Sequence, residues 1–341
     1  MGVNASLNSL PSGALLALDA GNSKTDAAVL GPDGAVLGAA RGGGFQPQAT
    51  GPEAAVAELA RTVGAAGGSG HRFALVTACL ANADLPREER AMEQRIAAYG
   101  WGEELRVAND TFAVLRAGLA DGAEERHGSG VGVVCGAGIN CVGRAADGRT
   151  HRFPAIGELS GDWGGGGGLA RAALWHAARA EDGRGERTAL AKELPAHYGL
   201  PSMYALIEAL HMGELPGARR HEAVPVLFRV AEGGDPVARR LVLRQAEEIA
   251  SMATVSMDRL GLPAESTPVV LGGAVAAARH PLLHETLAER FPVLRVVTEP
   301  PVLGAGLLAL DHTGAPPHAH ARLRGHYRKA SDQCSVTSGA P

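Results

Sequence analysis

The chain has 341 residues, which is long enough for two packed domains, and its 32 basic and 36 acidic side chains give a formal net charge of −4. This balance creates no strong field of either sign, so we expect neither a nucleic acid nor a membrane as a partner. The four cysteines form no CxxC pair and no apolar run approaches the roughly 18 residues of a membrane helix, which predicts a protein of the reducing cytoplasm.

The two halves of the chain show the same order of expected elements. In the first half, an apolar run at 14–18 leads into a glycine turn, and strands at 26–30 and 35–37 follow. In the second half, 130–134 leads into another glycine turn and then a strand at 141–144. Helical periodicity comes after each of these units, at 52–63, 87–99, 111–119, 169–179 and 235–260. The sequence therefore predicts an α/β protein built by internal duplication.

The last part of the chain differs from the rest. Residues 313–341 are mainly small and polar and show no apolar period, so we expect a disordered tail. The histidines in and next to this segment suggest either a metal tract or solvated side chains, and the second interpretation is preferred. They are His312, His318, His320 and His326.

Both glycine turns directly follow a buried strand. Residues 21–25 and 136–140 are therefore expected to expose backbone N–H groups in a small concavity, which suits a phosphate chain. Neither turn matches a P-loop or a dinucleotide fingerprint, because both lead into another strand rather than a helix. Tight hairpins are the alternative interpretation, and the duplication favours phosphate binding. Lys24 and Thr25 are candidates for phosphate contacts, although a solvated Lys24 is equally consistent with the sequence.

Three aspartates lie at positions where a carboxylate can bind a metal ion, accept a proton or contact a ligand. Asp19 ends the first strand, where it can hold Mg²⁺ or cap the turn. Asp110 precedes the helix at 111–119 and either accepts a proton from a bound hydroxyl or serves as an N-cap; the residues alone favour the cap. We expect the helix N-terminus to lower the pKa of Asp110. Asp162 lies just before the glycine cluster 164–168, which indicates a folded loop at a ligand site rather than a linker.

Five motifs occur together in this order: DAGNSKTDAAVL, NDTFAVLRAG, GVGVVCGAGINCVGR, GELSGDWGGGGG and VVLGGAVAA. With this combination the chain resembles, over residues 15–310, the BadF/BadG-type ATPases of the sugar kinase, chaperone and actin superfamily, and within them the N-acetylglucosamine kinases. The resemblance implies two ribonuclease-H-like (actin-like ATPase) α/β domains, at 12–120 and 121–312, with ATP and Mg²⁺ in a central cleft. It implies a cytoplasmic enzyme with a small-molecule sugar substrate, and it allows a homodimer.

The resemblance also implies roles for individual residues. Asp110 falls on the position of the catalytic base and Asp19 on a metal position. The residues expected to bind ATP are Gly21, Asn22, Ser23, Lys24, Thr25, Gly136, Ala137, Gly138, Gly272, Gly273 and Ala274. The residues expected to bind the sugar are Gln46, Asn109, Asp110, Gly157 and Asp162.

The implied activity is ATP-dependent phosphorylation of an amino sugar, N-acetylglucosamine to its 6-phosphate, by direct in-line transfer. Three departures from the pattern of the relatives bear on it: Ala137 replaces a hydroxyl residue, Gln46 replaces a sugar-binding Asn, and Trp163 replaces an acidic residue. Trp163 is either a wall for the sugar ring or part of the loop packing. Glucosamine or another hexosamine is an alternative substrate. A non-catalytic sugar or nucleotide sensor and a reductase-activating ATPase are alternative functions, the latter requiring cysteines that share an iron–sulfur cluster.

Overall fold

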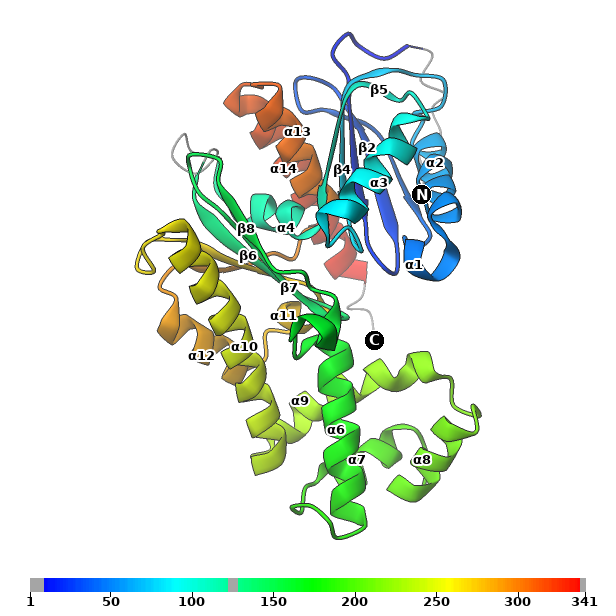
Figure 1. The fold of residues 1–341 in the computed structure, drawn as a ribbon, viewed down its shortest axis with the longest axis vertical. Helices are drawn as coiled ribbons and strands as arrows, with labels where there is room; N and C mark the ends of the chain where they lie inside the picture. Colours follow the sequence, from blue (N-terminus) through cyan, green and yellow to red (C-terminus); the bar gives the residue numbers. More distant parts are fainter. Residues whose placement is uncertain (1–8, 122–127, 338–341) are drawn as a thin grey trace. The chain divides into compact units, whose positions relative to one another are not determined.

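The computed structural model describes residues 9–121 and 128–337, with side chains up to residue 329. It divides into two compact units (Figure 1). Unit 1 contains the chain up to residue 132, residues 144–149 and the chain from 297 onward, and unit 2 contains 133–143 and 150–296. Two domains were expected, but the division differs from the expected one at 120 and 312, because the C-terminal segment returns to pack against the N-terminal sheet.

Unit 1 contains a five-stranded sheet of order β3-β2-β1-β4-β5. Its strands are β1 (Leu15–Ala20), β2 (Thr25–Leu30), β3 (Val36–Gly42), β4 (Phe73–Leu80) and β5 (Gly102–Asn109). β1 pairs antiparallel with β2 and parallel with β4, which pairs parallel with β5. β1 and β2 are buried along their whole length because helices cover both faces of the sheet, which explains the uninterrupted apolar run of the first strand.

The helices of unit 1 form two layers, one on each face of the sheet. On one face, apolar side chains of β1 pack with those of α2 (Pro52–Ala65) and α3 (Pro86–Ala97), next to the short α1 (Pro47–Thr50). The other face carries α4 (Thr111–Gly118), α13 (Val302–His312) and α14 (Pro317–Thr337). Figure 1 shows α13 and α14, in orange and red, beside the blue N-terminal strands. This layer joins the two ends of the chain in one core.

Unit 2 is organised around a second sheet, of order β10-β9-β6-β7-β8. Its strands are β6 (Gly130–Cys135), β7 (Ile139–Arg144), β8 (Thr150–Arg152), β9 (Val269–Gly272) and β10 (Leu294–Val296). In both sheets three strands consecutive in sequence lie next to one another, and the fourth and fifth are added beside the first of them. The shared strand order confirms the predicted internal duplication.

Unit 2 carries a larger set of helices than unit 1. They are η1 (Gly157–Ser160), α6 (Gly165–Glu181), α7 (Leu190–His197), α8 (Met203–His211), η2 (Gly217–Glu222), α9 (Ala223–Glu232), α10 (Pro236–Leu260), α11 (Ala274–Ala277) and α12 (Pro281–Arg290). The long helix α10 begins where the Asp235 carboxylate accepts the Ala238 N–H at 2.9 Å, and it ends at Gly261, whose φ is 67°. Both capping signals were readable in the sequence.

The C-terminal segment is a helix over Pro317–Thr337, so the expectation of a disordered tail is wrong for these residues, while 338–341 lie outside the described residues. Ala319, Leu323 and Tyr327 of α14 are buried in the core of unit 1. His320 is also buried, whereas His318 and His326 are exposed, so solvation was wrongly expected for His320 alone. The apolar positions of α14 recur only once per helical turn, so the sequence shows too little apolar periodicity to predict a helix there. No helix in the described part of the chain is long and apolar enough to cross a bilayer.

Candidate active site

The first glycine turn connects β1 to β2, in the strand–turn–strand order that the sequence predicts. The Gly21 N–H donates to the Lys24 carbonyl at 2.8 Å, which closes the turn and leaves Asn22 and Ser23 exposed at its tip. The loop that contains Gly44 packs closely against this turn, since even a Cβ at Gly44 would overlap the Asn22 carbonyl. The backbone of this turn is therefore accessible and held in one shape.

Two side chains fix the turn through Asn22. Gln46 Nε2 donates to the Asn22 carbonyl at 2.7 Å, and Asn82 Nδ2 donates to Asn22 Oδ1 at 2.8 Å. Gln46 Nε2 is used in fixing the turn, so the Oε1 atom is the part of this side chain that remains for the predicted sugar contact. Asn82 was not identified from the sequence; its left-handed φ of 58° is visible only in the folded chain.

Thr25 and Lys24 follow the turn. Thr25 is fully buried, and its hydroxyl has no hydrogen-bond partner in the described part of the chain, so its phosphate contact stays a prediction. Lys24 is partly exposed, and its Nζ lies 3.6 Å from Asp26 Oδ2. Arg41 donates to the same carboxylate from Nε at 2.6 Å and from Nη2 at 3.0 Å. Asp26 and Arg41 were missed by sequence reasoning, although Asp26 stands within the first motif.

Asp19 lies at the end of β1, opposite Asp26 in the strand register. Burial, followed by the negative charges of Asp110 and Asp26, raises the pKa of Asp19 well above its usual range, against the weaker opposing effect of Lys24 and Arg41. Its carboxylate accepts no hydrogen bond from any other residue that the structure describes. Because neighbouring carboxylates repel one another, this arrangement favours a cation between them.

The described residues contain no group of three or more His, Cys, Asp or Glu side chains that could enclose a metal ion. A protein cage for a metal is therefore absent from the described part of the chain. Mg²⁺ commonly uses one or two carboxylates together with phosphate oxygens and water. The carboxylate of Asp19, with that of Asp110 close enough to raise its pKa, fits this second mode.

Asp110 stands between β5 and α4, at the N-cap position, but its side chain does not cap the helix. The cap is Asn109, whose Oδ1 accepts the Thr111 N–H at 3.0 Å while its Nδ2 donates to Asp84 Oδ1 at 2.8 Å. The backbone of Asp110 is tied to β4 through a 3.2 Å bond from its N–H to the Leu80 carbonyl. The carboxylate of Asp110 is thereby available for another role.

The pKa of Asp110 is raised, so the expectation that the helix N-terminus would lower it is wrong. Burial raises the pKa from an ordinary value of 3.8 to about 6, and the hydrogen bonds with Thr111 offset only part of this effect. Desolvation of the carboxylate outweighs the field of a two-turn helix at this position. A carboxyl group with this pKa is ionised for most of the time at neutral pH and can still accept a proton.

The second glycine turn, in unit 2, is covered by the N-terminus of α6. Within the turn, the Gly136 N–H donates to the Gly138 carbonyl at 3.0 Å. The Gly166 N–H donates to the Gly136 carbonyl at 2.6 Å, and the Gly167 N–H donates to the Ala137 carbonyl at 2.8 Å. The helix start needs glycine at residue 165, where φ is 65° and a Cβ would overlap the Gly138 backbone.

The third glycine motif meets the same turn. Gly273 follows β9 with a φ of 88°, and a Cβ there would lie 2.5 Å from the Cys135 carbonyl oxygen and 2.8 Å from the Gly136 nitrogen. Gly272 is buried and Ala274, the first residue of α11, is exposed. Three motifs from distant parts of the sequence are therefore assembled around one point of unit 2.

A cavity of about 400 Å³ lies beside this point. Gly138, Gly157 and Asp162 line it, together with the glycine-rich start of α6. Asp162 Oδ2 accepts the Gly157 N–H at 3.0 Å and the Ser160 hydroxyl at 2.6 Å, which leaves its Oδ1 for a ligand. The volume is within the range of small-molecule sites.

Three basic side chains of the cavity were not found by sequence reasoning: Arg171, Arg220 and His221. They come from α6 and η2, and no motif marks them. Trp163 is not among the lining residues; instead the guanidinium of Arg244 stacks over its ring at 4.0 Å. This contact favours loop packing over a sugar-stacking role for Trp163.

The predicted residues are thus assembled into two groups, one within each unit. Unit 1 holds Asp19, residues 21–25, Gln46, Asn109 and Asp110, and unit 2 holds residues 136–138, Gly157, Asp162 and residues 272–274.

The two similarly ordered sheets define the class of fold. The chain matches the structure of a candidate N-acetylglucosamine kinase from Chromobacterium violaceum at 22% identity with a TM-score of 0.64, covering 87% of this chain and 98% of that one. It matches a ROK family glucokinase from Streptomyces griseus, solved with glucose and AMPPNP, at 18% identity with a TM-score of 0.53, covering 88% and 99%. The fold is the two-domain, actin-like fold of these sugar kinases.

The sequence narrows this class to one family. The model of the BadF/BadG/BcrA/BcrD ATPase family matches residues 16–309, so the chain belongs to this family, as the motifs predicted. It is 28% identical over 199 residues to the N-acetylmuramic acid/N-acetylglucosamine kinase of Clostridium acetobutylicum, covering 57% of this chain and 62% of that protein. It is 24% identical over 242 residues to the N-acetyl-D-glucosamine kinase of Dictyostelium discoideum, covering 68% and 75%. The first match therefore spans less than two thirds of the Clostridium kinase.

Proposed function

We propose that the protein transfers the γ-phosphoryl group of ATP to a hydroxyl of an amino sugar, with the 6-hydroxyl of N-acetylglucosamine as the first candidate acceptor. The observation that carries this proposal is the state of Asp110. Its capping role is taken over by Asn109, its pKa is about 6, and it lies next to the buried carboxylate of Asp19. Membership of an ATPase family and the names of the two relatives support the same reaction.

Asp110 is the proposed general base. The acceptor hydroxyl donates its hydrogen bond to the Asp110 carboxylate, and the carboxylate takes the proton as the oxygen attacks phosphorus. The bond from phosphorus to the bridging oxygen of ADP breaks as the new phosphorus–oxygen bond forms, so one sugar phosphate and one ADP result. A base whose pKa is close to neutral pH combines a high ionised fraction with a useful proton affinity.

Asp19 is the proposed holder of Mg²⁺, together with phosphate oxygens. The fit rests on a buried carboxylate that accepts no hydrogen bond from the described residues and that faces repulsion from Asp110 and Asp26. When bound, Mg²⁺ would neutralise charge on the phosphate oxygens. In its absence Lys24 and Arg41 supply the positive charge nearest to this carboxylate.

The remaining residues have proposed binding roles. Backbone N–H groups of the turns at 21–25 and 136–138 would hold phosphate oxygens, and residues 272–274 would contact the adenosine. In unit 2, the free Oδ1 of Asp162 would accept a hydrogen bond from a sugar hydroxyl at the cavity. In unit 1, Gln46 would contact the sugar through its Oε1 atom. Asn109, whose Oδ1 and Nδ2 bond Thr111 and Asp84, would hold the neighbouring Asp110 in place at the sugar.

N-Acetylmuramic acid is a second candidate acceptor, favoured by a specific observation. It carries a carboxylate, and the cavity beside Asp162 is lined by Arg171, Arg220 and His221. Arg171 also pairs with Glu158 at 2.9 Å, so Arg220 is the clearer candidate for pairing with an acidic substituent. The Clostridium relative is named for both sugars.

A reductase-activating ATPase is disfavoured by the placement of the thiols. Cys79, Cys135 and Cys141 are all buried, and burial raises the pKa of Cys135 and of Cys141 to about 12. Such thiols are poor ligands for a cluster shared between two chains. The side chain of Cys334 lies outside the described residues.

The test is coupled ADP release with a panel of N-acetylglucosamine, N-acetylmuramic acid, glucosamine and glucose, with Mg²⁺ present and chelated. We expect Mg²⁺-dependent turnover that is highest with an N-acetylated sugar, and phosphorus NMR of the product identifies the modified hydroxyl. Sugar-independent ADP release, or nucleotide binding without turnover, would contradict the proposal and favour a sensor. Arg220→Ala tests whether the carboxylate of N-acetylmuramic acid pairs with the basic side chains of the cavity. The control is Arg187→Ala, at an exposed arginine that does not line the cavity.

A further inference from the structure

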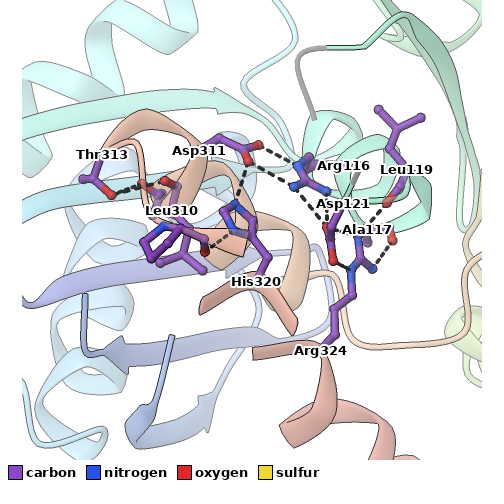
Figure 2. A network of polar contacts seen from close by, with 11 residues as sticks. Arg116, Ala117, Leu119, Asp121, Leu310, Asp311, Thr313, His320 and Arg324 are labelled. Carbon is purple, nitrogen blue, oxygen red and sulfur yellow. Dashed lines mark hydrogen bonds and ion pairs between the residues drawn. The ribbon is translucent and has the colours of Figure 1, made fainter. Parts of the chain in front are cut away.

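The helix α4, which follows Asp110, is held at its far end by a network of charged side chains (Figure 2). Arg116, in its last turn, is only 1% exposed. Arg116 donates to both carboxylate oxygens of Asp311, from Nε at 2.6 Å and from Nη2 at 3.0 Å, and also lies 3.2 Å from Asp121 Oδ1. His320 of α14 adds a 2.9 Å contact from its Nε2 to Asp311 Oδ1. The network thus links α4, α13 and α14.

Arg324 connects α14 directly to the end of α4. Its Nη1 donates to the Ala117 carbonyl at 2.7 Å and its Nη2 to the Leu119 carbonyl at 2.6 Å. Its Nε donates to Asp121 Oδ2 at 2.7 Å. The carbonyls at a helix C-terminus have no partner within the helix and carry partial negative charge, so a guanidinium satisfies both needs there.

A buried charge favours one position of the helix that carries it. If α4 slid or rotated, Arg116 would lose Asp311 or Asp121 and remain buried without a partner, which is strongly unfavourable. Gly304 of α13 holds the side of α4, because even a Cβ there would overlap the Ala113 carbonyl. α4 has only eight residues, so its ends move together. A displacement at Arg116 is therefore transmitted to Asp110.

We propose that the C-terminal helix α14 is a positioning element for the general base, acting from Arg324 through the end of α4 on Asp110. This inference rests on the proposed function for its link to catalysis. Arg324 touches no residue of the proposed phosphate or sugar contacts, so it is a positioning residue rather than a catalytic one.

The test compares Arg324→Ala with Arg322→Ala. Arg322 is on the same helix and also forms an ion pair, with Asp33, but among the described residues it forms no hydrogen bond or ion pair with α4. We expect Arg324→Ala to lower kcat by roughly 10-fold to 100-fold, as small misplacements of reacting groups do, while the KM values for sugar and ATP change less than about threefold. Arg322→Ala should keep kcat within about twofold. Arg324→Lys, which keeps the charge without the planar fork, should restore part of the lost kcat.

Hydrogen exchange supplies a readout that does not require turnover. The amides of Ala113 and Val114 donate to the Asp110 carbonyl at 3.0 and 3.4 Å, so their exchange reports on the backbone at residue 110. We expect Arg324→Ala, in the full-length folded protein, to speed exchange at these amides at least fivefold, and Arg322→Ala to leave them unchanged.

The outcomes separate the two proposals. A lower melting temperature of Arg324→Ala with unchanged kcat and unchanged exchange at Ala113 and Val114 would overturn the positioning role and leave only a structural one. If the wild-type protein phosphorylates no sugar, the proposed function fails, and the exchange data alone decide the inference: acceleration that reaches residue 113 supports it, and acceleration confined to residues 116–121 and α14 refutes it.

Discussion

Replacing Asp110 by asparagine should lower activity and raise stability at the same time. The substitution keeps the shape of the side chain and removes its charge. As the general base, Asp110 should contribute about 10²-fold to 10⁴-fold to kcat, so Asp110→Asn should lose a comparable factor. The same carboxylate is ionised at neutral pH in a site that disfavours its charge, so the folded protein should be more stable without it.

The magnitude of the stability gain follows from the pKa. An increase from 3.8 to about 6 corresponds to about 3 kcal/mol at about 1.4 kcal/mol per pH unit. Because Asp110 keeps partial access to solvent, which screens its charge, we expect about 1–3 kcal/mol. Since the folded-state pKa is above the unfolded value, this part of the stability is fully present below about pH 4 in the wild type and is lost as the pH rises through about 6. The gain of the variant should therefore appear at pH 7.5 and vanish near pH 4.

The assay is a pair of thermal melts, at pH 7.5 and pH 4, together with coupled ADP release. At roughly 2–4 °C per kcal/mol, the melting temperature of Asp110→Asn should rise by several degrees at pH 7.5. Asp26→Asn is the matched control, because Asp26 is paired with Arg41 and Lys24, and its loss should lower the melting temperature. Unchanged turnover of Asp110→Asn would remove the base assignment, and a loss of stability at pH 7.5 would show that the folded site stabilises the charge of Asp110 instead of disfavouring it.

Three further predictions concern other parts of the structure. The kcat of the wild type should fall tenfold per pH unit below about 6, because protonated Asp110 accepts no proton; a pH–rate profile that stays flat to pH 5 contradicts this. Gly304→Ala should force α13 away from α4 and lower the free energy of unfolding by about 1–3 kcal/mol, measured by denaturant unfolding. A free energy of unfolding equal to that of the wild type would contradict the close contact between the two helices. Gly273→Ala places a side chain at a φ of 88° against the Cys135 carbonyl, so the KM for ATP should rise by tenfold or more in steady-state assays. An unchanged KM would show that this turn does not bind the nucleotide.

Much of the candidate site was readable from the sequence because its signals are local. A buried strand followed by a glycine turn has its own pattern of residues, and the turns at 21–25 and 136–140 form as predicted. The caps of α10 at Asp235 and Gly261 depend only on neighbouring residues. The repeated strand order and the family also follow from such local motifs.

Other features of the site depend on residues that meet only after folding. The sequence could not show that Asn109 caps α4, because Asp110 is an equally suitable cap residue. It could not show the pKa of Asp110, since burial is a property of the surrounding fold. Arg41 in β3 and Arg220 in η2 carry no motif, because a charged side chain in the sequence looks the same whether it lines a site or faces water.

The sequence by itself determined the duplicated strand plan, the glycine turns and the family, since these depend on short-range preferences of the backbone. Only the tertiary structure decided the fate of the C-terminal segment. Its apolar residues, one per turn, gain nothing from an isolated helix, and they become buried only against α13 and the N-terminal sheet. The ion pairs of Arg324 with Asp121 and of Arg116 with Asp311 likewise join groups far apart in the chain, so no local pattern could reveal the helix that holds the end of α4.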